Sequence, residues 1–272
     1  MNPTDPGADD FDHNEGQQFY YRALTALNES KVPFLLGGAY ALERYTGIAR
    51  DTKDLDLFVR PEDCRRALTA LSDNGCQTEL TFPHWLGKAY CGEYFADIIF
   101  SSGNAVAKVD DEWFRHAIDD EMLGVPVKLC PVEETIWSKA FVMERERYDG
   151  ADIAHLLLAR ADKMDWRRLL SRFGRHWRVL FSHIVLFGFV YPSKRSQIPE
   201  WVVGELVGNL NAEISAPAPT EPVCQGTLLS REQYLIDIEQ WGYKDPRLIP
   251  GGTMTPAETD LWTEAIDHQK KN

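Results

Sequence analysis

Residues 35–40 read LLGGAY, and residues 54–59 read DLDLFV. Together they predict a strand, a glycine turn, a helix, and a second strand that carries Asp54 and Asp56. Because side chains alternate between the two faces of a strand, both carboxylates should point to one side and the leucines to the other. Such a pair repels and, without a cation, costs stability or takes up a proton. With Mg²⁺ it forms half of a metal site built from hard oxygen ligands.

A third carboxylate, Asp97, stands among apolar residues in the stretch 94–100, YFADIIF. An unpaired charge in such a strand is costly, so Asp97 should have a partner. If this strand lies beside the strand 54–59, about 4.8 Å away, the three carboxylates converge. The triad would then hold two Mg²⁺ ions about 3.5–4 Å apart.

The glycines add a second feature. Gly37 and Gly38 lie just before the predicted helix, where backbone N–H groups lack partners inside the helix and can face a phosphate. Taken alone, Asp-x-Asp is also typical of a solvated edge strand or a turn. The glycine turn upstream and Asp97 downstream favour a nucleotide-phosphate and metal site.

Other motifs with a known chemistry are missing from the sequence. There is no Gly-x-x-x-x-Gly-Lys-Ser/Thr run of a P-loop and no Gly-x-Ser-x-Gly elbow of an α/β-hydrolase. The seven histidines show no spacing that suits a transition metal. These observations leave the carboxylates as the main chemical signal.

The charge distribution leaves one question open. The formal net charge is −13, and a uniformly acidic surface would disfavour nucleic acid. Basic residues nevertheless gather between Arg160 and Arg195, where the only acids are Asp162 and Asp165. This run is either an RNA-binding face or a solvated helix face.

The cysteines and the apolar runs indicate the compartment. Five cysteines, an odd number without CxxC spacing, predict reduced thiols in a cytoplasm and neither a disulfide frame nor a zinc site. No apolar run reaches the roughly eighteen residues of a membrane span. The acidic N-terminus has no hydrophobic core and does not fit a secretory signal or transit peptide. We expect a cytoplasmic protein without a membrane partner.

One spaced pattern over residues 37–97 combines glycines, an arginine, a threonine and aspartates. The pattern consists of Gly37-Gly38, Arg50-x-Thr52-x-Asp54-x-Asp56 and the strand residue Asp97. It resembles the DNA polymerase β-like nucleotidyltransferase superfamily over about residues 33–160. The motif Arg-x-Thr-Lys-Asp-Leu-Asp-Leu at residues 50–57 is most similar to that of the minimal nucleotidyltransferases. These include abortive-infection toxins of bacterial toxin–antitoxin pairs.

The resemblance implies a mixed sheet flanked by helices, an NTP donor, and a site for two Mg²⁺ ions, with Mn²⁺ as a substitute. Asp54 and Asp56 match the paired metal ligands. Asp97 matches the third carboxylate, which is credited with activating the acceptor hydroxyl. Gly37 and Gly38 match the turn that contacts phosphate, although many members carry a serine where Gly38 stands.

The resemblance extends to basic residues further along the chain. The toxin branch carries a lysine followed by Arg-x-Asp-x-x-Asp, and here Lys139 precedes residues 147–152, RYDGAD. By that match Lys139 binds the triphosphate, Asp149 caps the next helix, and Asp152 orients Lys139 or Arg50. A solvated lysine and a purely structural N-cap are the alternatives.

The loop before the aspartates carries two further candidates. Arg50 and Thr52 flank the strand of the paired aspartates. They would either hold donor phosphate or tie down the loop.

The periodicities predict a small α/β domain followed by a helical C-terminal domain, and with the mixed sheet that the resemblance implies, the expected fold class is α/β (α+β). We expect a disordered tail over residues 1–14, a nucleotidyltransferase catalytic domain over 15–130, a helical domain over 131–212, a linker over 213–226, and a short helix with a polar tail over 227–272. The expected strands are 33–36, 54–59, 76–82, 94–100 and 125–129, and the expected helices include 17–27, 39–45, 111–118, 133–147 and 230–240.

Three functional hypotheses follow. The first is an enzyme that transfers a nucleoside monophosphate from NTP to a hydroxyl on an RNA end, a protein side chain or a small molecule. The second is a non-catalytic nucleotide- or RNA-binding module on the same fold. The third, which is compatible with the first, is an interaction protein with an antitoxin as its partner. The intact set of three carboxylates argues for the enzyme.

Overall fold

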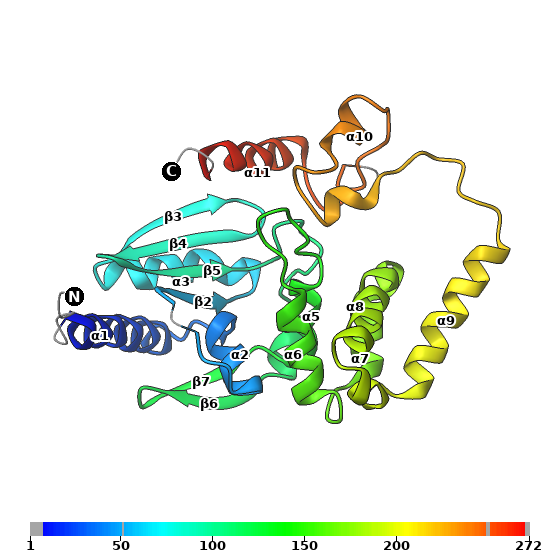
Figure 1. The fold of residues 1–272 in the computed structure, drawn as a ribbon. Helices are drawn as coiled ribbons and strands as arrows, with labels where there is room; N and C mark the ends of the chain where they lie inside the picture. Colours follow the sequence, from blue (N-terminus) through cyan, green and yellow to red (C-terminus); the bar gives the residue numbers. More distant parts are fainter. Residues whose placement is uncertain (1–7, 51, 249–250, 270–272) are drawn as a thin grey trace, which may run out of the picture. The chain divides into compact units, whose positions relative to one another are not determined.

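The computed structural model describes residues 8–50, 52–248 and 251–269 (Figure 1). The chain divides into two compact units, which we describe separately. The first unit comprises Met1–Glu43, Ile48–Ser101 and Lys108–Pro131, and the second comprises Arg44–Gly47, Ser102–Ala107 and Val132–Asn272.

A seven-stranded mixed sheet forms the centre of the first unit, in the order β3-β4-β5-β2-β1-β7-β6. Its strands are β1 (Leu35–Leu36), β2 (Asp54–Phe58), β3 (Gln77–Phe82), β4 (Leu86–Cys91), β5 (Tyr94–Ile99), β6 (Ile118–Met122) and β7 (Val125–Leu129). Strand β2 runs parallel to β5 and antiparallel to β1. The sheet therefore places β2 and β5, which are distant in sequence, directly side by side.

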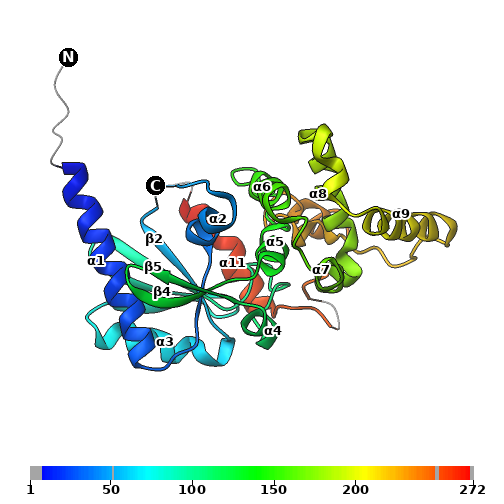
Figure 2. The ribbon, with the colours of Figure 1, turned by 90° about the horizontal axis from the view of Figure 1, so that it is seen from below.

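The helices of the first unit are α1 (Ala8–Glu29), α2 (Gly38–Thr46, whose last residues are grouped with the second unit), α3 (Pro61–Asp73) and α4 (Asp111–Arg115). Helices α1 and α3 contact each other and the sheet, and Figure 2 shows both helices running along it.

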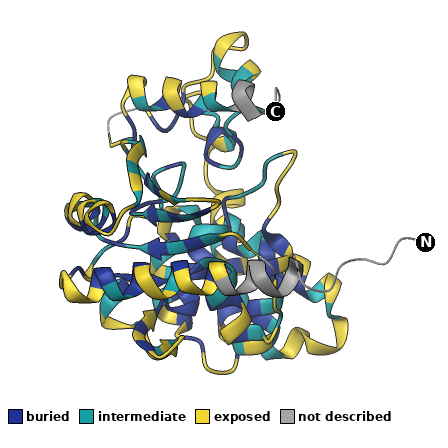
Figure 3. Ribbon diagram, turned by 90° about the vertical axis from the view of Figure 1, so that its left-hand side faces the viewer, coloured by how far each residue is buried: buried dark blue, intermediate teal, exposed yellow. Residues whose placement is uncertain are grey.

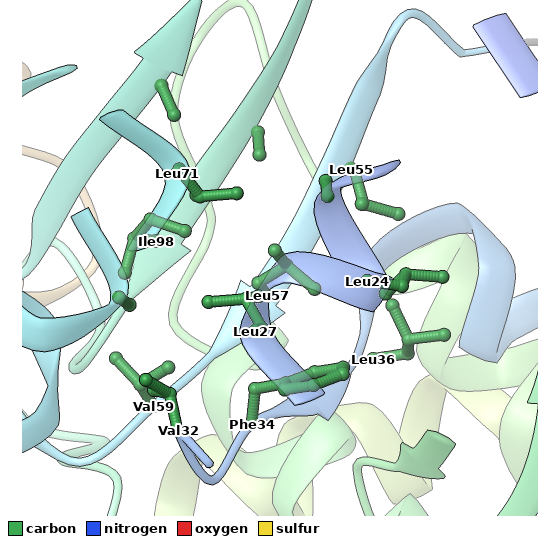
Figure 4. Packing of buried hydrophobic residues seen from close by; sticks show 14 of the residues in the cluster. Leu24, Leu27, Val32, Phe34, Leu36, Leu55, Leu57, Val59, Leu71 and Ile98 are labelled. Atoms are coloured by element: carbon green, nitrogen blue, oxygen red, sulfur yellow. The ribbon is translucent and has the colours of Figure 1, made fainter. Parts of the chain in front are cut away.

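Alternating burial along β2 fixes which way its side chains point. Leu55 and Leu57 are buried, whereas Asp54 and Asp56 are only partly buried. Figure 4 shows the two leucines packed with Leu24, Leu27 and Leu71 of the flanking helices. Burying one such side chain contributes about 1.5–3 kcal/mol, so the apolar face holds the strand in register and directs both aspartates to the opposite face.

The second unit is helical, as predicted for this part of the chain. Its helices are α5 (Val132–Lys139), α6 (Gly150–Arg160), α7 (Trp166–Phe173), α8 (Trp177–Val190), α9 (Glu200–Ser215), α10 (Leu235–Glu239) and α11 (Pro256–Gln269), with short 3₁₀ turns between some of them. Figure 3 shows that buried residues gather along the strands and along one side of the packed helices. None of the helices in the described part of the chain combines the length and the apolar character needed to cross a bilayer.

Several predicted elements are wrong in extent. The first helix begins at Ala8 and not at residue 17, so residues 8–14 of the predicted tail are helical, while residues 1–7 lie outside the described part. The helix predicted over 111–118 ends at Arg115, because the chain turns there into β6. The helix predicted over 133–147 ends at Lys139, and α11 occupies most of the predicted polar tail.

The prediction that all cysteines are reduced is also wrong. Cys76 and Cys91 form a disulfide with their Cα atoms 4.7 Å apart. They flank the cross-strand pair Gln77 and Tyr90 at the open end of the β3–β4 hairpin, a proximity that their separation of 15 residues does not reveal. Among the free thiols, burial raises the pKa of Cys64 to about 11, which makes it unreactive.

His183 of α8 provides a pH-dependent element in the second unit. Its Nε2 lies 2.9 Å from the Ala140 carbonyl oxygen, and the ring is buried. Burial lowers the pKa of His183, and the hydrogen bond to Ala140 opposes that shift only in part. The folded protein therefore binds a proton less readily than the unfolded chain.

We expect the free energy of unfolding to fall as the pH drops from about 6.5, the unfolded histidine value, through the lowered folded pKa. His183→Gln should flatten this slope in urea titrations at several pH values. The matched control is His116→Gln, a partly exposed histidine 3.4 Å from Glu112. An unchanged slope in His183→Gln would contradict the assignment.

Candidate metal and nucleotide site

Three carboxylates meet on the face of the sheet opposite the leucines of β2. In the β2–β5 ladder Asp56 is the direct partner of Asp97, and Asp54 lies opposite Phe95. Asp54, Asp56 and Asp97 each offer an oxygen, and these oxygens lie within 4.8 Å of one another. The predicted convergence of the three side chains is thereby confirmed.

The electrostatics of the site follow from this crowding. Burial raises the pKa of Asp97, and the charge of Asp54 adds to that effect, while a hydrogen bond and the charge of Lys88 oppose it. Burial also raises the pKa of Tyr20, again with added contributions from Asp54 and Asp56. The Tyr20 hydroxyl donates to the Thr52 carbonyl oxygen at 2.9 Å. Tyr20 is therefore a protonated phenol.

Lys88 is the residue that sequence reasoning missed. Its Nζ lies 2.6 Å from Oδ1 of Asp97, which it faces across the β4–β5 ladder. Strand β4 was not predicted, so the partner of Asp97 was not identified. The available signal was a lysine within the largely apolar stretch 86–91, LGKAYC, where a buried amine needs a carboxylate.

The glycine turn is held against Asp56 by the backbone. The Gly37 N–H donates to the Asp56 carbonyl oxygen at 3.0 Å, and the Ala41 N–H donates to the Gly37 carbonyl oxygen at 3.0 Å. Gly38 has a φ of +53°, and a Cβ atom there would overlap the Asp56 carboxylate. A serine at position 38 would therefore require the Asp56 side chain to shift.

Thr52 has a structural contact, and Arg50 is exposed. The Asp54 N–H donates to the Thr52 hydroxyl oxygen at 3.4 Å, so Thr52 ties the loop to the start of β2. Arg50 stands on the same loop, with an exposed side chain. The contact of Thr52 agrees with the alternative that it anchors the loop.

Lys139 belongs to the second unit and lies within a compact ionic cluster. Its Nζ is 2.9 Å from Oδ2 of Asp149 and 2.9 Å from Oδ2 of Asp152, and Arg147 contacts Asp149 at 3.0 Å. Burial alone would raise the pKa of Asp149, but hydrogen bonds and charges from Arg147 and Lys139 outweigh it and lower that pKa.

The predicted capping role of Asp149 is wrong. The residue occupies the N-cap position of α6, but its side chain makes no capping hydrogen bond, because the carboxylate is engaged by the two cations. The predicted contact between Asp152 and Lys139 is present.

The basic run between Arg160 and Arg195 is largely engaged within the second unit. Arg168 bonds both Glu133, at 2.5 Å, and Glu134, and Arg172 bonds Glu134 at 3.0 Å. Both glutamates are buried. Other arginines of the run have their own contacts: Arg160 with the Tyr45 carbonyl oxygen, Arg167 over the Trp201 ring, and Arg178 with Glu213. Arg168, Arg172 and Arg178 are thus paired with carboxylates and have less charge to offer RNA phosphates.

The donor set fits a hard divalent cation. The cluster contains carboxylates only, and Mg²⁺ and Mn²⁺ prefer such oxygen ligands, whereas zinc sites usually include sulfur or imidazole. Three carboxylates at this spacing repel one another, and Lys88 supplies one positive charge against three negative ones. The site therefore has both the ligand chemistry and the excess negative charge for a divalent ion.

No protein-family model matches the chain, and no curated protein matches it. Solved structures do show similarity. The antibiotic-resistance factor ANT(2'')-Ia has a TM-score of 0.45 and 19% identity over 62% of this chain and 97% of that one. The lincosamide antibiotic adenylyltransferase LnuA, bound to lincomycin, has a TM-score of 0.37 and 15% identity over 51% of this chain and 92% of that one.

An antigenic nucleotidyltransferase-like protein from Paracoccidioides brasiliensis has a TM-score of 0.40 and 12% identity, over 66% of this chain and 90% of that one. The names of these solved structures include nucleotidyltransferases, the class of protein that the sequence pattern of this chain resembles. All three TM-scores are below 0.5.

Proposed function

We propose that the chain is a metal-dependent nucleotidyltransferase, which moves a nucleoside monophosphate from an NTP donor to a hydroxyl acceptor. One observation carries the proposal: oxygens of Asp54, Asp56 and Asp97 lie within 4.8 Å of one another on adjacent parallel strands. Asp54, Asp56 and Asp97 would hold two Mg²⁺ ions, with Mn²⁺ as a substitute. When bound, the ions supply charge neutralisation of the triphosphate and a lower pKa of the acceptor hydroxyl.

In the proposed reaction the acceptor oxygen attacks the α-phosphorus. The new oxygen–phosphorus bond forms as the bond between the α-phosphorus and the bridging oxygen breaks, and pyrophosphate leaves. The acceptor proton passes to Asp97, whose pKa is raised chiefly by burial. A carboxylate with a raised pKa is the stronger base and suits this role.

Donor binding is assigned to the glycine turn and to three side chains. The backbone N–H groups after Gly37 and Gly38, at the start of α2, suit an anionic phosphate. Arg50, Thr52 and Lys139 complete the proposed nucleotide contacts. Asp149 and Asp152 hold the Lys139 ammonium at 2.9 Å each, so they act as its positioning residues.

Lys139→Met should raise the dissociation constant of a non-hydrolysable NTP by roughly tenfold to hundredfold, because a hydrogen bond to a charged group contributes about 1.5–3 kcal/mol. Isothermal titration calorimetry with Mg²⁺ measures this change. Arg145→Met, which removes an exposed charge in the same segment, is the control. If both variants bind the NTP as tightly as the unchanged chain, Lys139 does not contact the nucleotide.

The reaction itself is tested with labelled NTPs and a panel of acceptors. The panel contains RNA with free 3′ ends, proteins, and small hydroxyl compounds that include an aminoglycoside and a lincosamide. We expect a labelled product and pyrophosphate that depend on Mg²⁺ or Mn²⁺. The absence of product with every acceptor, despite tight NTP binding, would favour the non-catalytic binding module instead.

The resemblance of residues 50–57 to abortive-infection toxins extends the proposal to a cytoplasmic toxin with an antitoxin partner. Expression at low level in the native host should slow growth, and a tagged chain should co-purify with the product of a neighbouring gene. Normal growth in the presence of active enzyme would contradict the toxin role and leave the transferase intact.

A further inference from the structure

Lys88 lies in one transverse row with two of the three carboxylates. Asp56 pairs directly with Asp97 across the β2–β5 ladder, and Asp97 pairs directly with Lys88 across the β5–β4 ladder. Direct partners in a ladder project to the same face of the sheet. The ammonium therefore belongs to the face that carries the candidate metal site.

The Lys88 ammonium is held from two directions. Its Nζ is 2.6 Å from Oδ1 of Asp97 and 4.4 Å from the centre of the Phe95 ring, which attracts a cation through its π-electrons. The side chains of Lys88 and Asp97 are only 20% and 16% exposed. An ion pair with so little water around it is much stronger than an exposed pair.

The charges explain why such a lysine is present. Asp54, Asp56 and Asp97 place three negative charges within a few ångströms, which would repel one another when no metal is bound. Lys88 offsets one of these charges. A divalent cation that binds the same carboxylates meets this ammonium as a like charge and competes with it for Asp97.

We propose that Lys88 is a positioning residue that serves as the counter-ion of the carboxylates without metal, and that a divalent ion displaces its ammonium from Asp97. The inference rests on the metal site of the proposed function. It predicts that the lysine weakens divalent-ion binding while it stabilises the metal-free chain. Lys88 thereby keeps the three carboxylates together while no metal ion is bound.

The test is a Mn²⁺ titration of the full chain, with free Mn²⁺ measured by electron paramagnetic resonance. Lys88→Met should bind Mn²⁺ more tightly, on the order of tenfold, because a like charge beside the ion is removed. The same variant should melt at a lower temperature without metal. Lys88→Arg, which keeps the charge, should stay close to the unchanged chain in both measurements.

A matched control exists on the same sheet. Lys128 faces Asp119 across the β6–β7 ladder with Nζ 2.5 Å from Oδ1, so Lys128→Met removes a cross-strand ion pair that is more exposed than the pair of Lys88 and Asp97. It should leave Mn²⁺ affinity unchanged. If Lys88→Met binds Mn²⁺ as tightly as the unchanged chain or more weakly, Lys88 does not oppose metal binding and the inference is wrong.

A second measurement uses the unchanged chain, in case Lys88→Met does not fold. Brief acetylation followed by mass spectrometry reports how accessible each lysine amine is. Saturating Mn²⁺ should increase labelling of Lys88 severalfold and leave Lys128 unaffected, since only the first amine is displaced. Equal labelling of Lys88 with and without Mn²⁺ would overturn the displacement.

The outcomes separate this inference from the proposed function. If the unchanged chain binds no Mn²⁺, or if Asp54→Asn binds it equally well, the metal site itself fails. If Mn²⁺ binding requires Asp54 but does not respond to Lys88, only the role of the lysine fails.

Discussion

Replacing Asp54 and Asp56 by asparagine should lower the rate of nucleotide transfer by about 10³-fold or more. Asparagine keeps the shape of aspartate but removes the charge, so the site loses two of its three anionic ligands. Metal ions contribute several kcal/mol of transition-state stabilisation, and each 1.36 kcal/mol changes a rate tenfold. Initial rates with labelled NTP at saturating Mg²⁺ measure the effect.

Stability measurements distinguish a metal site from a structural cluster. Without metal, the Asp54→Asn, Asp56→Asn variant should be at least as stable as the unchanged chain, because repulsion among the carboxylates is relieved. The control Asp119→Asn changes an exposed carboxylate of the same sheet and should keep full activity. Full activity in the double variant would refute the enzyme proposal.

Gly38→Ala should combine a stability loss of about 2–5 kcal/mol with the loss of Mn²⁺ binding. The φ of +53° is unfavourable for any residue with a Cβ, which costs about 1–2 kcal/mol. The new Cβ would also overlap the Asp56 carboxylate, and such overpacking costs typically 1–3 kcal/mol. Relief of the overlap requires the Asp56 carboxylate to leave its present position in the cluster with Asp54 and Asp97.

Gly92→Ala is the matched control for this variant. Gly92 also has a positive φ, +72°, but a Cβ there meets nothing within 4 Å. It should therefore lose stability through backbone strain alone and bind Mn²⁺ normally. Urea denaturation and Mn²⁺ titration of both variants give the comparison. Normal Mn²⁺ binding by folded Gly38→Ala would mean that the glycine is not needed for the placement of Asp56.

The parts of the site that depend on local pattern were predictable. Alternation in DLDL fixed the common face of Asp54 and Asp56, and the apolar neighbours of Asp97 predicted a buried strand that needed a partner. The convergence was predicted only on the condition that β5 lies beside β2, and the ladder between the two strands meets that condition.

The parts that depend on distant partners were not predictable. The stretch 86–91, which carries Lys88, has little periodicity, so neither β4 nor the ion pair to Asp97 was expected. Arg168 and Arg172 of the basic run looked free because their partners, Glu133 and Glu134, lie on a different helix. Local sequence reveals a charge, but packing decides which opposite charge it meets.

The position of Asp97 on β5 would make the proposed metal binding a reporter of correct folding. Strand β5 must insert beside β2 after the chain has passed through α3, β3 and β4, a non-local pairing that forms late and slowly. A slip of β5 by one residue would turn Asp97 toward the apolar face and Ile98 toward the carboxylates. Only chains with the native register would then bind the ion. The fraction of chains that bind it during refolding would therefore measure the fraction in which β5 is correctly paired.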